Sequence, residues 1–214
     1  MLDLFLKYIN PIKIIVLLTL LLGFVYLKKN NTIHQKVLAL LMVSFLTEYS
    51  IFIFFYYKRS IFLMYSVSFV IHHSLWILLL RDFVDYKGRI LLWMLLFIVF
   101  GVLNMTFFEG SNSINYYTFL LGAFIYLYFF ISESFTQLQR DNFSFLTSNN
   151  YILLFSPVLF FLGYSFMFAF QDYSVISTKL FGKIELYDFI GNLVNGIYYF
   201  VLNLYIFKEK KCNG

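Results

Sequence analysis

Seven separate hydrophobic stretches, each about long enough to cross a lipid bilayer, fill the chain between Pro11 and Phe207. A crossing helix needs about 20 mainly apolar residues, because the bilayer core is about 30 Å thick and each residue adds about 1.5 Å. Charged residues make up 13% of the chain, whereas a soluble domain carries roughly a quarter. The sequence therefore predicts an all-α, polytopic membrane bundle. The seven predicted transmembrane helices span residues 11–27, 37–57, 61–80, 90–108, 116–131, 151–170 and 186–207.

The connections between these stretches are short, which leaves no room for a separate soluble catalytic domain. A single domain over residues 1–214 is therefore expected. The longest predicted loops cover residues 132–150, which are rich in polar side chains, and residues 171–185. Ser156–Pro157 predicts a kink in the sixth helix, because proline removes a backbone N–H and clashes with the preceding turn.

The distribution of Lys and Arg predicts the orientation, because cytoplasmic loops carry an excess of these residues. The side that holds the N-terminus carries six of them, and the opposite side carries ten, among them Lys28, Lys29 and Lys36. This excess favours an N-terminus outside and a C-terminus in the cytoplasm. The net charge of +5 is explained by residues that flank apolar helices and meet anionic lipid head groups. No direct binding of nucleic acid is expected.

Ionisable residues inside apolar segments are costly, and they are the first candidates for function. Three lie deep in the predicted helices: Glu48, His72 and His73. Glu48 and His72 lie at similar distances from the predicted turn at Lys58–Arg59, so we expect them to pair across two antiparallel helices. Trp76 shares the helical face of His72. A proton relay, a ligand anchor or a gating pair is one interpretation, and a hydrogen bond that only locks two helices together is the other.

A second polar pattern runs along the seventh predicted helix. Asp188, Asn192, Asn195, Tyr199 and Asn203 recur at intervals of three or four residues, which places them on one face. Amide side chains in a lipid environment must find partners in other helices or in water. The stripe is therefore compatible with a wetted path through the membrane and with packing between helices.

Motifs of soluble enzyme chemistry are missing from the sequence. It contains no HExxH, GxSxG, phosphate-binding loop or dinucleotide fingerprint. Of its three histidines, His34 is predicted to lie in a loop away from His72 and His73, whereas catalytic zinc needs three protein ligands. A metal site built from two histidines with Glu48 or Asp188 is the weakest alternative. We expect a protein without enzymatic activity, metal or cofactor.

Three short motifs, Leu46–Glu48, Ser156–Tyr164 and Asn192–Tyr199, stand in the second, sixth and seventh predicted helices, and a lysine-rich end follows the last of them. With these motifs the chain resembles a loosely defined set of small seven-helix membrane proteins of Bacteroidota-type bacteria. The resemblance covers nearly the whole length and implies a multi-pass protein of the bacterial inner membrane. It also implies a signalling or defence neighbourhood, without an established chemistry.

Two functions follow from these observations. The first is a sensor or regulatory module that responds to a ligand or to the state of the membrane and signals through its cytoplasmic loops. The second is an oligomeric pore, a transporter or a membrane effector, including a CRISPR-associated or other phage-defence accessory. The expected partners are the lipid bilayer and a cytosolic protein, a membrane protein or further copies of the chain.

Overall fold

The computed structural model describes residues 11–57, 60–169, 178–180 and 184–213. Those residues are almost entirely helical, which confirms the all-α prediction. Among them, five helical stretches are long and apolar enough to cross a membrane, and this supports a membrane protein. The number of seven crossings stays a prediction. The five stretches are Phe62–Phe83, Lys87–Phe108, Tyr116–Gln139, Asn149–Ala169 and Leu186–Lys210.

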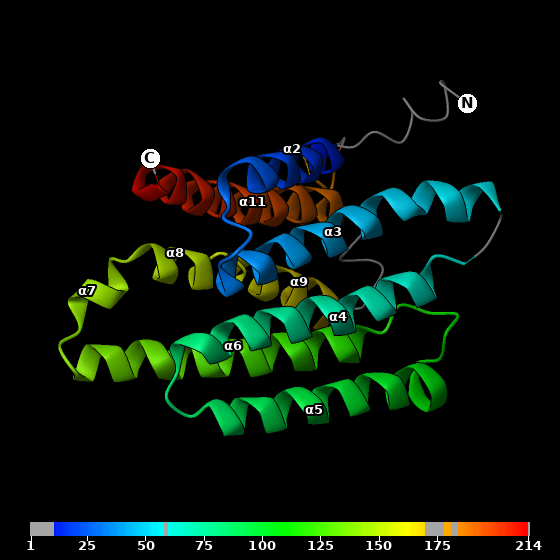
Figure 1. Cartoon of the computed structure of the whole chain (residues 1–214). Coiled ribbons are helices and arrows are strands. Elements are labelled where there is room, and N and C mark those ends of the chain that lie inside the picture. The colour runs from blue at the N-terminus through cyan, green and yellow to red at the C-terminus, as the bar shows by residue number, and fades with distance from the viewer. Residues whose placement is uncertain (1–10, 58–59, 170–177, 181–183, 214) are drawn as a thin grey trace. The chain divides into compact units, whose positions relative to one another are not determined.

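The chain divides into two compact units, Met1–Tyr126 and Leu127–Gly214, whose boundary lies inside helix α6. In the first unit each helix packs on the next in the chain, α2 on α3, α3 on α4 and α4 on α5 (Figure 1). Its elements are α2 (Pro11–Tyr26), α3 (Thr32–Tyr56), α4 (Phe62–Leu80), the 3-10 turn η1 (Arg81–Phe83), α5 (Lys87–Leu103), the π-helical turn η2 (Asn104–Phe108) and the start of α6 (Tyr116–Gln139).

In the second unit the long C-terminal helix α11 packs against α8 and α9. A glycine allows this close approach, since a side chain at Gly163 in α9 would collide with Val194 in α11. After the end of α6 the elements of this unit are α7 (Phe143–Leu146), α8 (Asn149–Phe155), α9 (Val158–Ala169), the antiparallel strand pair β1 (Lys179–Leu180) and β2 (Ile184–Glu185), and α11 (Leu186–Asn213).

The predicted kink at Ser156–Pro157 is confirmed. Helix α8 ends at Phe155 and α9 begins at Val158, so the sixth predicted helix is two shorter ones. The Ser156 hydroxyl donates to the Leu153 carbonyl at 2.7 Å and so satisfies a backbone acceptor at the break. The predicted end of this helix at residue 170 lies outside the described residues.

Two other boundaries were predicted wrongly. The fifth helix was expected to end at residue 131, but α6 continues to Gln139 through the first part of the predicted loop 132–150. Glu133 and Gln137, which stand four residues apart, bond to each other along this extension. His34 was placed in a loop, but it lies in the first turn of α3 and is 2% exposed. The predicted turn at residues 58–59 is outside the described part of the chain.

Many large apolar side chains are left uncovered, as expected for a surface in contact with lipid. The clearest case is α5, where one side of the helix is at least half exposed over its whole length. The residues concerned are Leu92, Leu95, Leu96, Val99 and Val102.

Candidate functional site

Glu48 has a charged neighbour on α2 that was not predicted from the sequence. Glu48 lies half-buried in α3, and the positive charge that acts on its carboxylate belongs to Lys13 of α2, which is 7% exposed. The neighbouring Tyr49 hydroxyl donates to the Lys13 backbone carbonyl at 3.3 Å. The titratable neighbour that acts on His72 is His73. The carboxylate thus interacts with a charge on α2, and its pairing with His72 stays a prediction.

The reason lies in the rotation of α3 about its own axis. Successive helical side chains point about 100° apart, so adjacent residues meet different neighbours. Thr47 takes the side that meets α4, where its hydroxyl lies 2.7 Å from that of Ser68. The Ser50 hydroxyl also bonds to a residue of α4, the sulfur of Met64. This leaves Glu48 for the side that meets α2.

His73 is one of two fully buried residues among the predicted site residues. It is fully buried, and its Nδ1 donates to the Phe69 carbonyl one turn earlier, at 2.7 Å. Its ring packs edge-on against Phe119 of α6, with 4.8 Å between centroids. Gly122 lies under the ring, where an added methyl group would come within 2.6 Å of the imidazole Cδ2. His73 therefore holds α4 and α6 together.

His72 and Trp76 share a face of α4, as predicted. Their ring centroids are 6.5 Å apart, and His72 is only half-buried. Trp76 is fully buried and packs edge-on against Tyr126 at 6.0 Å. The two histidines point in different directions, with 6.1 Å between their rings.

The polar stripe of α11 is split along its length. Asp188 and Asn192 are exposed, whereas Asn195 and Tyr199 are buried. The Asn195 amide donates to the Tyr164 hydroxyl of α9 at 2.7 Å and to the Gly191 carbonyl at 2.8 Å. The second half of the stripe thus serves helix packing, and the first half faces away from the rest of its unit.

A cluster around Glu109 was not predicted. Its carboxylate accepts bonds from the backbone N–H groups of Tyr116 and Tyr117, at 3.0 and 3.2 Å, and so caps α6 from seven residues away. It also accepts a bond from the Asn104 side chain, which in turn donates to the Thr118 hydroxyl at 2.9 Å. Only a local signal, the Glu109–Gly110 pair after an apolar run, points to this place in the sequence, and it indicates no more than a helix end.

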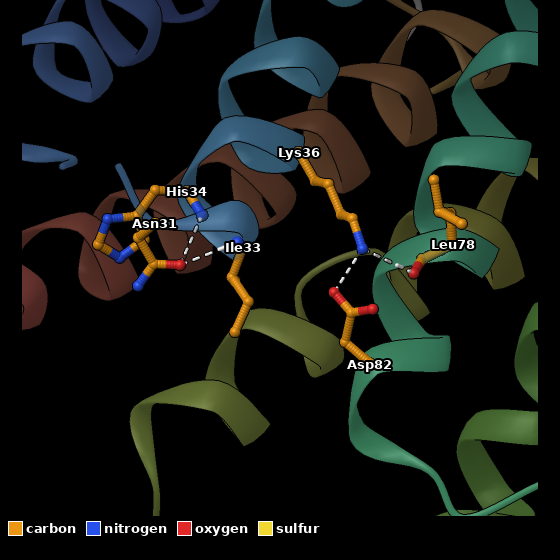
Figure 2. A network of polar contacts seen from close by, with 6 residues as sticks. All are labelled: Asn31, Ile33, His34, Lys36, Leu78 and Asp82. Carbon is orange, nitrogen blue, oxygen red and sulfur yellow. Dashed lines mark hydrogen bonds and ion pairs between the residues drawn. The ribbon is translucent and has the colours of Figure 1, made fainter. Parts of the chain in front are cut away.

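A second unpredicted contact connects α3 to the turn that follows α4. The Lys36 ammonium forms an ion pair with Asp82 and lies 3.4 Å from the Leu78 carbonyl (Figure 2). Asn31 accepts bonds from the backbone N–H groups of Ile33 and His34 and caps the start of α3, as Figure 2 also shows. One end of α3 is thereby fixed to the end of α4.

No three His, Cys, Asp or Glu side chains among the residues described come together in a way that could hold a metal ion. Comparison of the chain with protein-family models, with curated proteins and with solved structures found no match. The polar contacts between helices are therefore the basis for a functional proposal.

Proposed function

We propose that this protein is a sensor or regulatory module of the bacterial inner membrane, without enzymatic activity, and that it signals through cytoplasmic loops. Seven crossings, an outside N-terminus and a cytoplasmic C-terminus are part of the proposal, as is the likeness to small seven-helix proteins of Bacteroidota-type bacteria. The observation that supports it best is the set of polar and charge interactions along α3. They involve Glu48 with Lys13, Thr47 with Ser68, and Lys36 with Asp82.

These interactions would allow α3 to switch between two positions relative to α2 and α4. Its middle carries a carboxylate that interacts with α2, while its first turns carry the Lys36–Asp82 pair with the end of α4. A charge in an apolar setting strongly favours the arrangement in which it keeps its partner. A stimulus that changes the Glu48–Lys13 interaction would therefore shift α3, and the shift would reach Lys36 and the neighbouring loops.

Replacement of the carboxylate by an amide tests this mechanism. In nanodiscs, spin labels would be placed at two exposed positions, Lys29 just before α3 and Lys87 at the start of α5, in a background where Cys212 is serine. They would measure the distance between the starts of α3 and α5. Glu48→Gln should change the distance distribution, and Glu185→Gln, at an exposed carboxylate, should not. An unchanged distribution in a folded Glu48→Gln protein would argue against α3 as the moving element.

The alternative is an oligomeric pore or membrane effector, which includes a phage-defence accessory. One observation favours it: Asp188 and Asn192 are exposed on the helix that carries the polar stripe. Further copies of the chain could cover these side chains and leave a wet path between them. Liposomes that contain the purified protein would then pass small ions, and Asp188→Leu with Asn192→Leu would abolish the flux. Flux at the level of empty liposomes would remove this alternative.

The proposed orientation in the membrane can be tested with the natural cysteine of the chain. Cys212 is the only cysteine, and it stands at the C-terminal end of the last predicted crossing. In sealed right-side-out vesicles, a maleimide that cannot cross the membrane should leave Cys212 unlabelled until detergent is added. Labelling of intact vesicles would place the C-terminus outside and reverse the proposed orientation.

A further inference from the structure

Four polar side chains are enclosed where α4, the end of α5 and the start of α6 meet. Ser66, Asn104, Asn115 and Thr118 are each at most 1% exposed. The Ser66 hydroxyl accepts a bond from the Asn115 backbone N–H at 3.3 Å, and Asn104 donates to Thr118 at 2.9 Å. Asn115 stands just before α6, where its carbonyl accepts a bond from the Phe119 N–H at 3.2 Å, and Thr118 lies in the first turn. The Asn104 amide therefore bonds to the turn of α6 that follows Asn115. We call these four residues the amide cluster.

The amide cluster contains polar atoms that the described residues do not satisfy. Neither the oxygen nor the nitrogen of the Asn115 side chain has a hydrogen-bond partner among them, and the Asn104 Oδ1 has none either. The nitrogen and oxygen of the Asn104 amide are told apart by their partners, because Nδ2 donates to the Glu109 carboxylate and to Thr118. A buried amide without hydrogen-bond partners destabilises the fold.

The chemistry of these atoms defines what could satisfy them. The Asn115 nitrogen is a donor of two hydrogens, while the Asn115 and Asn104 oxygens are acceptors. A metal cation could be coordinated by the two oxygens, but it would be repelled by the hydrogens on the amide nitrogen. A neutral group that both donates and accepts serves all three. The cluster also adjoins the π-helical turn η2, which begins at Asn104, and such turns occur frequently at functional sites.

We propose that the amide cluster binds a small neutral molecule that both donates and accepts hydrogen bonds. Water and a small solute with a hydroxyl or amide group share this chemistry. The site is independent of the proposed sensor mechanism, because it involves neither Glu48 nor the Lys36–Asp82 pair. It adds a ligand position in the interior of the first unit.

Solid-state NMR of the full chain in lipid tests the proposal, with magnetisation transferred from water to side-chain amides. The Asn115 amide should gain signal at short transfer times. Asn195 is the matched control, since its amide is buried and donates to Tyr164 and Gly191. Loss of the Asn115 water signal on addition of acetamide, together with a shift of its resonance, would identify a solute site. Retention of the water signal would identify bound water.

Two results would overturn the proposal. One is an Asn115 amide with no water transfer and no response to acetamide. The other is a shift that depends on replacement of sodium by choline, which would identify a cation site instead. A variant gives an independent check. Asn115→Leu should lower the melting temperature by about 2–4 °C, the effect of roughly one lost hydrogen bond in a chain of this size. A raised melting temperature would mean a dry amide and no ligand.

Discussion

The contact between His73 and Gly122 allows a quantitative prediction about the packing of α4 on α6. In Gly122→Ala, the new methyl group would lie 2.6 Å from the imidazole Cδ2 and 2.9 Å from Cε2 of Phe97. The ring cannot move easily, because Phe119 packs against it. Forcing an additional methyl group into a packed core costs about 1–3 kcal/mol, and the better helix propensity of alanine returns about 1 kcal/mol. The net effect is a loss of about 0–2 kcal/mol.

Gly196 of α11 provides the matched control, since no atom lies within 4 Å of the position that its Cβ would occupy. Gly196→Ala should gain about 1 kcal/mol from helix propensity alone. The two variants should therefore differ by about 1–3 kcal/mol, or roughly 2–12 °C in melting temperature for a chain of this size. Thermal unfolding in detergent, followed by circular dichroism, measures the difference. If Gly122→Ala melts at the same temperature as Gly196→Ala or above it, the described packing of His73 is wrong.

Three further predictions concern individual polar contacts. Asn195→Leu and Tyr164→Phe should each lower the free energy of unfolding by about 0.6 kcal/mol, and by about 1.7 kcal/mol at most. The double variant should lose no more stability than the larger of the two single variants. Additive losses in this double-mutant cycle would show that the two side chains do not bond. Lys36→Met should lower the free energy of unfolding by about 0.2–1 kcal/mol at low ionic strength, because both partners of the ion pair are partly exposed. In about 1 M salt the loss should almost vanish, since the Debye length falls to about 3 Å. A loss of stability that does not depend on salt contradicts an ion pair with Asp82. Glu109→Ala should lower the free energy of unfolding by about 0.5–2 kcal/mol and speed hydrogen exchange of the first amides of α6. Glu109→Gln keeps an acceptor oxygen and should lose less stability. Unchanged exchange in Glu109→Ala would exclude the cap.

The elements of the fold were largely predictable where a charge or a proline interrupts an apolar run. The last helix begins at Leu186, directly after Glu185, as the sequence predicts. The break at Pro157 follows from the missing backbone N–H. In contrast, polar residues after residue 131 were taken as a loop. A helix that continues beyond the apolar stretch tolerates them, and the Glu133–Gln137 pair supports it.

The partners of the polar residues were less predictable. The depth of a residue in the membrane can be counted along the chain. The rotation of a helix about its axis cannot be predicted in this way when apolar residues cover all its sides. For this reason the sequence predicts His72 as the partner of Glu48 and does not reveal the charge of Lys13 on α2. Lys13 looks like a flanking charge in the sequence and is buried against α3. Glu109 caps a helix that begins seven residues later, and no spacing rule reveals this.

The proposed function requires lipid around the exposed apolar helices, of which α5 is the clearest case. Size-exclusion chromatography of the purified full chain, before and after detergent is removed, tests this most directly. We predict a monodisperse peak in detergent and aggregation without it, because the uncovered side of α5 would meet water. A monodisperse, folded protein in plain buffer would contradict a membrane protein and with it the proposed function.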